Sequence, residues 1–370
     1  MAGILVIFGT RPEAIKLAPV IQELRRRNLP VCVCTTGQHR DMLDPILRVF
    51  GIQPAHDLDV MEENQAPLET TARIFERLPA VLDAVRPACT LVQGDTTSTL
   101  AAALVSFHRQ VPVAHVEAGL RTGDKLRPFP EEANRRLTTV LADVHFAPTR
   151  QAAENLTREG IATETIFITG NTVVDAVEAI LRKPISLAGS LGLCGGRMVV
   201  VTAHRRESLG TPLGRICDAV SSLAAAHCDL TVVFPVHRNP SVRESVAQRL
   251  GTQPRVLLVD PLPYPEFVHL LRRSCLVLTD SGGVQEEAPS IRTPVLVMRD
   301  VTERPEALAS GWVELVGTET ERILKRAEAW LKRDPSEFPP ASANPFGDGK
   351  ASERIADILS ARLTLAAGRK

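Results

Sequence analysis

Short runs of valine, isoleucine and leucine alternate with longer amphipathic stretches along most of the chain. This alternation is the pattern of repeated βα units, in which helices cover both faces of a parallel sheet. The sequence therefore predicts an α/β fold built from Rossmann-like, doubly wound parallel sheets. Because 370 residues exceed the size at which one hydrophobic core usually stops growing, we expect two such domains.

Twelve apolar runs are the expected strands. In the first domain they are residues 4–8, 31–35, 90–93, 111–116, 144–147 and 166–169. In the second they are residues 198–202, 231–235, 256–259, 276–279, 295–298 and 313–316. Helices are expected in the intervals between them.

The domain boundary falls either at residues 170–172 or in the glycine-rich stretch that follows Pro184. We favour the first, because residues 173–182 have the spacing of a helix that leads into the second domain. This gives an N-terminal domain at 1–172 and a C-terminal domain at 173–349. A helix at about residues 350–370 follows a proline-rich connector, and we expect it to pack back on the N-terminal domain.

Composition excludes several classes of protein. Lys and Arg together number 43, as do Asp and Glu, which argues against a nucleic-acid surface or an anionic membrane partner. The seven cysteines lack metal-ligand spacing, so we interpret them as reduced thiols and expect no metal site. The apolar stretch at residues 4–8 is too short for a signal-peptide core or a membrane span, and we expect a cytoplasmic protein.

Polar segments directly follow four of the expected strands. They are residues 93–96, 115–119, 202–207 and 280–287. The carboxyl ends of parallel strands face a common crevice, so this placement gathers carboxylates, a histidine, arginines and a glycine-rich turn. The sequence therefore predicts an active site at the carboxyl edge of the strands.

Three carboxylates are candidates for proton transfer. Asp95 and Glu117 each end an apolar strand, and Glu131 opens the helix that follows residues 128–130. The alternative for Asp95 and Glu131 is a cap on the next helix, whereas Glu117 has no obvious helix to cap. Carboxylates that share a pocket raise one another's proton affinity, so that some act as acids and others as bases.

Cationic side chains and N–H groups are candidates for binding an anion. Arg11 and Lys16 lie in the first turns of the helix after residues 9–11, where free N–H groups and the helix dipole favour an anion. A solvated helix face is the alternative. Gly282 and Gly283 allow N–H groups to approach a phosphate, although a glycine pair is also common in ordinary turns.

Three further residues follow strands at the same edge. His204 comes after a strand expected to be buried on both faces and precedes two arginines, which favours ligand contact or acid catalysis over a structural role. Arg304 lies in a charged run, which is usually solvated surface, but this run follows residues 295–298 and so places Arg304 at the crevice. His237 follows the expected strand at residues 231–235, so it is expected at the same edge.

Taken together and in order, these segments resemble the non-hydrolysing UDP-N-acetylglucosamine 2-epimerases. The motifs that carry the resemblance are residues 7–16, 36–40, 93–96, 117–122, 130–135, 204–208 and 280–287. The resemblance implies two domains of the glycosyltransferase-B type, the second of which binds UDP, and a homodimer. It also implies a UDP-sugar substrate, no metal or nicotinamide cofactor, and a role in cell-envelope polysaccharide biosynthesis.

The resemblance also implies residue roles. Asp95, Glu117 and Glu131 align with acid/base carboxylates, and His204 with a catalytic histidine at the diphosphate. Residues that align with substrate contacts are Arg11, Lys16, Arg135, Phe267, Ser281, Gly282, Gly283, Glu287 and Arg304. Some relatives bind a second, activating UDP-N-acetylglucosamine. Candidate contacts for such a site are Gln38, Arg206 and His237, while Asp41 stands where those relatives have a second glutamine.

The implied reaction is reversible C2 epimerisation of UDP-N-acetylglucosamine to UDP-N-acetylmannosamine, by elimination and re-addition of UDP through a 2-acetamidoglucal. The sequence leaves open which carboxylate is the acid and which the base. Three other functions stay open: a hydrolysing epimerase, a glycosyltransferase of the same architecture, and a nucleotide-sugar sensor without turnover.

Overall fold

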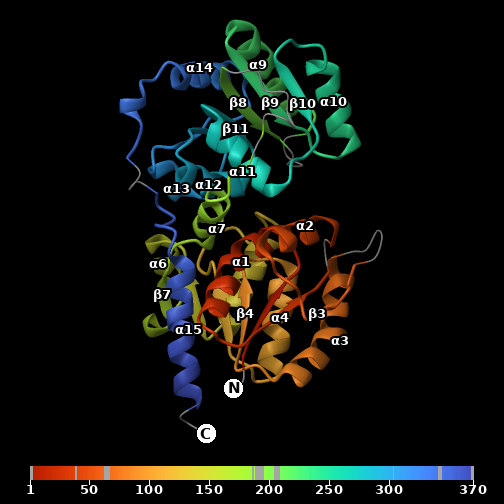
Figure 1. Cartoon of the computed structure of the whole chain (residues 1–370), viewed down its shortest axis with the longest axis vertical. Helices are drawn as coiled ribbons and strands as arrows, with labels where there is room; N and C mark the ends of the chain where they lie inside the picture. Colours follow the sequence, from red (N-terminus) through yellow and green to blue (C-terminus); the bar gives the residue numbers. More distant parts are fainter. Residues whose placement is uncertain are drawn as a thin grey trace. The chain divides into compact units, whose positions relative to one another are not determined.

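The computed structural model describes residues 3–37, 40–61, 67–185, 187, 196–203, 209–302, 304–340 and 344–367. The chain divides into two compact units, which Figure 1 shows in the colours of the sequence. Unit 1 comprises residues 1–176 and 346–370, and unit 2 comprises residues 177–345.

Unit 1 is built on a seven-stranded sheet in the order β3-β2-β1-β4-β5-β6-β7, and all its neighbouring strands are parallel. Its strands are β1 (Ile4–Phe8), β2 (Val31–Thr35), β3 (His56–Asp57), β4 (Cys89–Gln93), β5 (Val113–Val116), β6 (Val144–Ala147) and β7 (Ile166–Ile168). Every residue of β1, β4 and β5 is buried, because helices cover both faces of the sheet.

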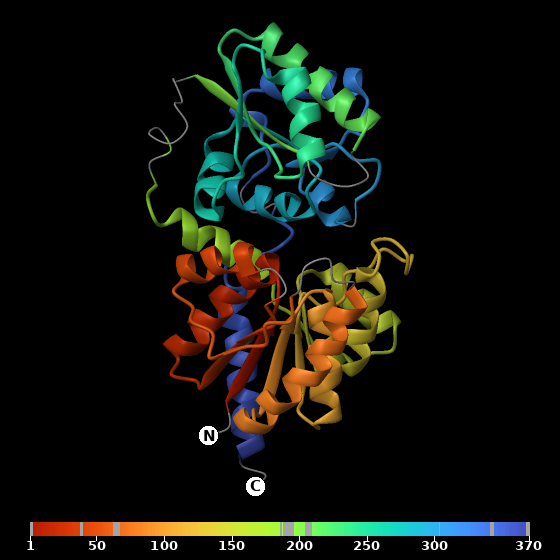
Figure 2. The ribbon, with the colours of Figure 1, turned by 90° about the vertical axis from the view of Figure 1, so that its right-hand side faces the viewer.

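Two helical layers enclose this sheet. The helices are α1 (Arg11–Arg26), α2 (Arg40–Phe50), α3 (Pro67–Val85), α4 (Thr97–His108), α5 (Glu131–Leu141), α6 (Arg150–Arg158), α7 (Thr172–Leu181) and α15 (Ala351–Ala367), with a 3-10 turn η1 (Thr163–Thr165). Helix α1 packs against α2 and α15, while α4 packs against α3 and α5. Figure 2 shows the strands between the layer of α1 and α2 and the layer of α3 and α4. The strand order reverses between β1 and β4: strands are added toward one edge up to β3 and toward the other edge from β4 onward. Doubly wound sheets bind ligands at such a point.

The division between the units falls inside α7, after Ala176. Directly before this point, the carboxylate of Asp175 accepts hydrogen bonds from the N–H groups of Ala351, at 3.2 Å, and Ser352, at 2.8 Å. These bonds tie the first turns of α7 to the start of α15. The first part of α7 therefore belongs with unit 1, slightly beyond residue 172.

Unit 2 contains a six-stranded parallel sheet in the order β10-β9-β8-β11-β12-β13. Its strands are β8 (Arg197–Thr202), β9 (Leu230–Pro235), β10 (Val256–Val259), β11 (Leu276–Thr279), β12 (Val295–Val297) and β13 (Val313–Leu315). Its other elements are α9 (Thr211–Ala226), α10 (Pro240–Leu250), α11 (Tyr264–Arg273), α12 (Gly282–Ile291), α13 (Pro305–Ala309), α14 (Thr320–Leu331) and the 3-10 turn η3 (Pro335–Glu337). Helix α14 packs against α9, much as α15 packs against α1 in unit 1.

Both strand orders are those of the Rossmann fold, so the expected α/β class with two doubly wound parallel sheets is confirmed. All twelve expected strands are present with small differences at their ends. The sequence did not predict β3, a two-residue edge strand without an apolar run. Within the described ranges, no helix combines the length and apolar character needed to cross a bilayer.

Candidate active site

Glu117 lies directly after β5, and its backbone adopts a φ of 65°. This left-handed conformation is unfavourable for a residue with a long side chain, and such residues cluster at functional sites. One carboxylate oxygen, Oε2, forms an ion pair with Lys16 Nζ. The same oxygen accepts hydrogen bonds from Gln93 Nε2 at 3.1 Å and Asn171 Nδ2 at 3.4 Å. The ion pair is almost completely buried, so both charges act in a medium that screens them weakly.

Asp95 lies on the turn between β4 and α4, and the first turns of α5 hold it in place. Its carboxylate forms an ion pair with Arg135 Nη2. The Nη1 atom of Arg135 lies 3.1 Å from the carboxylate of Glu132, which is completely buried. Asn134 Nδ2 donates to the backbone carbonyl of Asp95 at 3.0 Å. Asp95 is therefore fixed through both its side chain and its backbone.

The turns that carry Asp95 and Glu117 are neighbours. Gln93 is the register partner of Val116, and Gly94 N–H donates to the Val116 carbonyl at 3.0 Å. The parallel pairing of β4 and β5 thus brings the two carboxylates to the same sheet edge, as the sequence predicts.

Glu131 is the first residue of α5. Its Oε2 atom is buried and has no hydrogen-bond partner among the described residues. A buried polar atom without a partner costs free energy, and the start of a helix offsets the negative charge of a carboxylate. This oxygen therefore has an unused capacity to form a hydrogen bond.

The N–H groups at the start of α1 were expected to be free to bind an anion, but two of them are not. Those of Gly9 and Thr10 are not free for an anion, because they donate to Glu13 Oε2 at 3.0 Å and 2.7 Å. The expected anion site is therefore wrong for these two groups. Arg11, the first residue of α1, is exposed and leaves a cation at this turn.

In unit 2, Ser281 precedes α12, and Gly282 and Gly283 form its first turn. The first N–H groups of a helix have no partner within the helix and favour an anion. A Cβ atom added to Gly283 would meet nothing nearer than Ser281 Oγ, at 3.9 Å. The turn therefore has room for a phosphate group close to the backbone.

Two adjacent acidic residues of α12 form contacts with different side chains. The nearly buried Glu287 accepts a hydrogen bond from the Tyr264 hydroxyl of α11 at 3.1 Å. Arg304, which directly precedes α13, donates through Nε to the completely buried Glu286 at 2.6 Å. Phe267, on the first turn of α11, is half-buried. These contacts orient the carboxylate and the guanidinium that the sequence assigns to the ligand.

The candidate second-site residues are only partly described. His237 is exposed after β9, and its Nδ1 accepts a hydrogen bond from the Asn239 N–H at 3.2 Å. Gln38 and Arg206 lie outside the described residues, as does the catalytic candidate His204.

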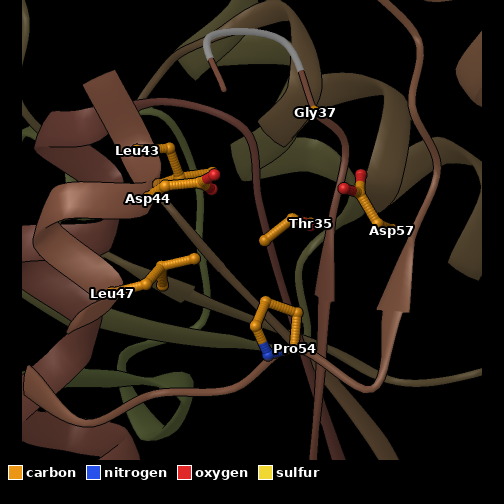
Figure 3. Close-up of a pocket in the computed structure, with 7 residues that line it drawn as sticks. All are labelled: Thr35, Gly37, Leu43, Asp44, Leu47, Pro54 and Asp57. Carbon is orange, nitrogen blue, oxygen red and sulfur yellow. The ribbon is translucent and has the colours of Figure 1, made fainter. Parts of the chain in front are cut away.

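A pocket of about 500 Å³ lies between β2, β3 and α2 (Figure 3). It is lined by Thr35, Gly37, Leu43, Asp44, Leu47, Pro54 and Asp57. In Figure 3 the carboxylates of Asp44 and Asp57 face each other across the opening. Among the described residues, this lining holds two carboxylates and neither Lys nor Arg, which does not favour a diphosphate. Within the described part of the chain, no group of three His, Cys, Asp or Glu side chains is placed to hold a metal ion.

The sequence interpretation missed several residues that shape the site. Gln93 had a usable signal, since it is a polar residue at the end of an apolar strand. Thr10 and Glu13 have the spacing of a capping box, which predicts that Glu13 reaches back to the start of its helix. Asn171 and Tyr264 contact their partners only through the tertiary fold, and their sequence surroundings contain no corresponding signal.

Comparison with known proteins gives consistent matches. A family model described as UDP-N-acetylglucosamine 2-epimerase matches residues 22–360. The chain is 48% identical over 368 residues to the UDP-N-acetylglucosamine 2-epimerase of Escherichia coli K12, covering 96% of this chain and 98% of that protein. A crystal structure of the Neisseria meningitidis enzyme of this name, bound to UDP-GlcNAc, has a TM-score of 0.90 and 43% identity over 96% of this chain and 99% of that one. The glycotransferase of kitacinnamycin, at 12% identity, has a TM-score of 0.66 over 98% of this chain and all of that one, which shows a shared fold.

Proposed function

The chain belongs to the UDP-N-acetylglucosamine 2-epimerase family, as its motifs predict, and on this premise we propose that it interconverts UDP-N-acetylglucosamine and UDP-N-acetylmannosamine by inversion at C2. The observation that carries this proposal is the group of three carboxylates, Asp95, Glu117 and Glu131, on neighbouring turns of unit 1. One is paired with Lys16, one is paired with Arg135, and one has an oxygen without a partner among the described residues. Such a set supplies a base and an acid at the same ligand.

The proposed chemistry begins with loss of UDP, because the C2 proton of a saturated sugar is not acidic. As the C1–O bond breaks, its electron pair leaves with UDP and positive charge develops at C1. An ordinary carboxylate then removes the C2 proton, and the C–H electron pair forms the double bond of a 2-acetamidoglucal. In the return step, a carboxylic acid protonates C2 from the other face and the UDP oxygen adds back to C1. No redox step occurs, and no cofactor is needed for the balance.

The residues divide into two groups in this proposal. Asp95, Glu117 and Glu131 exchange protons with the sugar, while His204, Arg11, Lys16 and Arg135 offset negative charge on the diphosphate. In unit 2, the first N–H groups of α12 bind phosphate, Glu287 and Arg304 contact the ribose and phosphates, and Phe267 contacts the uridine. The fixed positions of Glu287 and Arg304 support this assignment, because a buried partner holds each of them.

Proton NMR in deuterated water tests the proposal. The purified chain, given UDP-N-acetylglucosamine without added metal or cofactor, is expected to place deuterium at C2 of both epimers, because the base exchanges its proton with solvent. Unlabelled UDP-N-acetylmannosamine would contradict the route. Release of free N-acetylmannosamine and UDP would indicate a hydrolysing epimerase instead, and an unexchanged C2 proton with an acceptor-linked product would indicate a glycosyltransferase.

We also propose a homodimer. The neighbouring helices α4 and α5 expose the apolar side chains Phe107, Leu137 and Val140, the last of them 77% accessible. Exposed apolar patches mark association surfaces. Light scattering is expected to give about twice the chain mass of 40.2 kDa, and Val140→Glu is expected to shift the protein toward the monomer. A wild-type protein that is monomeric at micromolar concentration would exclude this assembly.

A further inference from the structure

The side chain of Glu13 links two turns of unit 1. It lies in the first turn of α1 and is 1% exposed. Its Oε2 accepts the N–H groups of Gly9 and Thr10, and its Oε1 lies 2.7 Å from Thr96 Oγ1 and 2.9 Å from Thr99 Oγ1. One carboxyl group thus joins the turn before α1 to the turn before α4.

The second of these turns carries Asp95, and it is held from the other side as well. His115 Nε2 lies 2.7 Å from the Gly94 carbonyl oxygen, and the His115 ring is completely buried. Burial lowers the pKa of His115 to about 3, so the ring is neutral and Nε2 donates to the carbonyl. Glu13 and His115 therefore fix the residues on either side of Asp95.

The number of hydroxyl protons indicates the charge of Glu13. Thr99 Oγ1 lies 2.7 Å from the Gln93 carbonyl, which can only accept, so the single hydroxyl proton of Thr99 is used there. The Thr96 proton fills the 2.7 Å contact with Glu13. Two contacts then remain, at 3.0 Å between the Thr96 and Thr99 hydroxyl oxygens and at 2.9 Å between Thr99 Oγ1 and Glu13 Oε1, and a proton on the carboxyl group fills the second of them. Burial also raises the pKa of Glu13, which favours this proton.

We propose that Glu13 is a protonated, neutral positioning residue that fixes the turn bearing Asp95 relative to the turn bearing Arg11. This inference rests on the proposed epimerase function, because it assigns Glu13 to the geometry of that reaction. A neutral side chain has a further consequence: it adds no negative charge beside the turn where Arg11 would meet a diphosphate. The substrate contacts themselves remain with Arg11, Lys16 and Asp95.

Substitution of Glu13 tests both parts of the proposal. Glu13→Ala removes the link and is expected to lower kcat by about 10²-fold while leaving KM within about twofold, since small displacements of catalytic groups have effects of that size. Glu13→Gln is neutral, has the same size and offers an amide N–H in place of the acid proton. It is expected to keep kcat within about threefold of wild type. If Glu13→Gln is as impaired as Glu13→Ala, the neutral state is wrong.

A second pair of variants separates positioning from folding. Thr99→Val removes the hydroxyl at nearly constant volume and is expected to lower kcat about tenfold, whereas Thr99→Ser restores the hydroxyl and the rate. Combining Thr99→Val with Glu13→Ala is expected to add little, because both act through one link. A normal kcat in Glu13→Ala would overturn the inference. So would a loss of activity that is fully explained by a lower Tm in every one of these variants. Inactive wild-type protein would instead refute the proposed function.

Discussion

Glu117→Gln is expected to lower kcat for epimerisation by about 10³-fold, because an amide cannot take up or return the C2 proton. The substitution preserves the size of the side chain, and the amide oxygen can still accept from Gln93 and Asn171. The change therefore removes the proton-transfer group with little change of shape. Rates of conversion and of C2 deuteration, both measured by proton NMR, report the loss.

Stability must be separated from catalysis in this variant. The Lys16 side chain is 10% exposed, so Glu117→Gln leaves a buried ammonium group without its carboxylate. Breaking a buried ion pair from one side costs about 3 kcal/mol or more. The double variant Lys16→Met, Glu117→Gln removes both charges and is expected to unfold at a temperature closer to that of wild type. Because Lys16 is also assigned to the diphosphate, this double variant tests stability only, and the loss of chemistry is measured in Glu117→Gln below its unfolding temperature.

A surface ion pair supplies the matched control. Asp83 pairs with Arg109 at 2.9 Å, and both side chains are well exposed. Asp83→Asn is expected to leave kcat and KM within about twofold of wild type, since exposed pairs contribute little. If Glu117→Gln retained more than a tenth of the wild-type kcat, Glu117 would not be a proton-transfer residue.

The sequence predicts the sheets well because their strands are buried on both faces. Strand β1 consists of apolar residues throughout, and β11 has three apolar residues before Thr279, so the ends of both strands can be located in the sequence. Strand β3 has no such run: His56 and Asp57 form a two-residue edge strand beside β2. Its hydrogen bonds depend on the neighbouring strand, so the local sequence does not reveal it.

The location of the site also follows from the sequence, whereas its contacts do not. Parallel pairing places the ends of β4 and β5 together, and this is enough to predict that Asp95 and Glu117 are neighbours. The pairing of Glu117 with Lys16 joins residues 101 positions apart, and nothing local specifies it. The same holds for the pairing of Arg304 with Glu286.

Asp95→Asn is expected to stop inversion at C2, with a loss of about 10²-fold or more, and to leave the fold intact. Arg135 loses one carboxylate partner in this variant but keeps Glu132 at 3.1 Å, so its charge remains compensated. The backbone of the turn also keeps its contact with Asn134. Thermal unfolding close to that of wild type is the check on this point.

Deuterium exchange in each epimer separately then shows which face of the sugar each carboxylate serves. We expect Asp95 and Glu117 to act on opposite faces, because they come from turns of different strands and bind different cations, Arg135 and Lys16. A carboxylate that removes the C2 proton can return deuterium to the same face without its opposite partner. Each of the variants Asp95→Asn and Glu117→Gln is therefore expected to exchange the C2 proton for deuterium in only one epimer. The epimer that exchanges is expected to differ between the two variants. Exchange of the same epimer in both variants would place the two carboxylates on one face and leave Glu131 as the group that acts on the other.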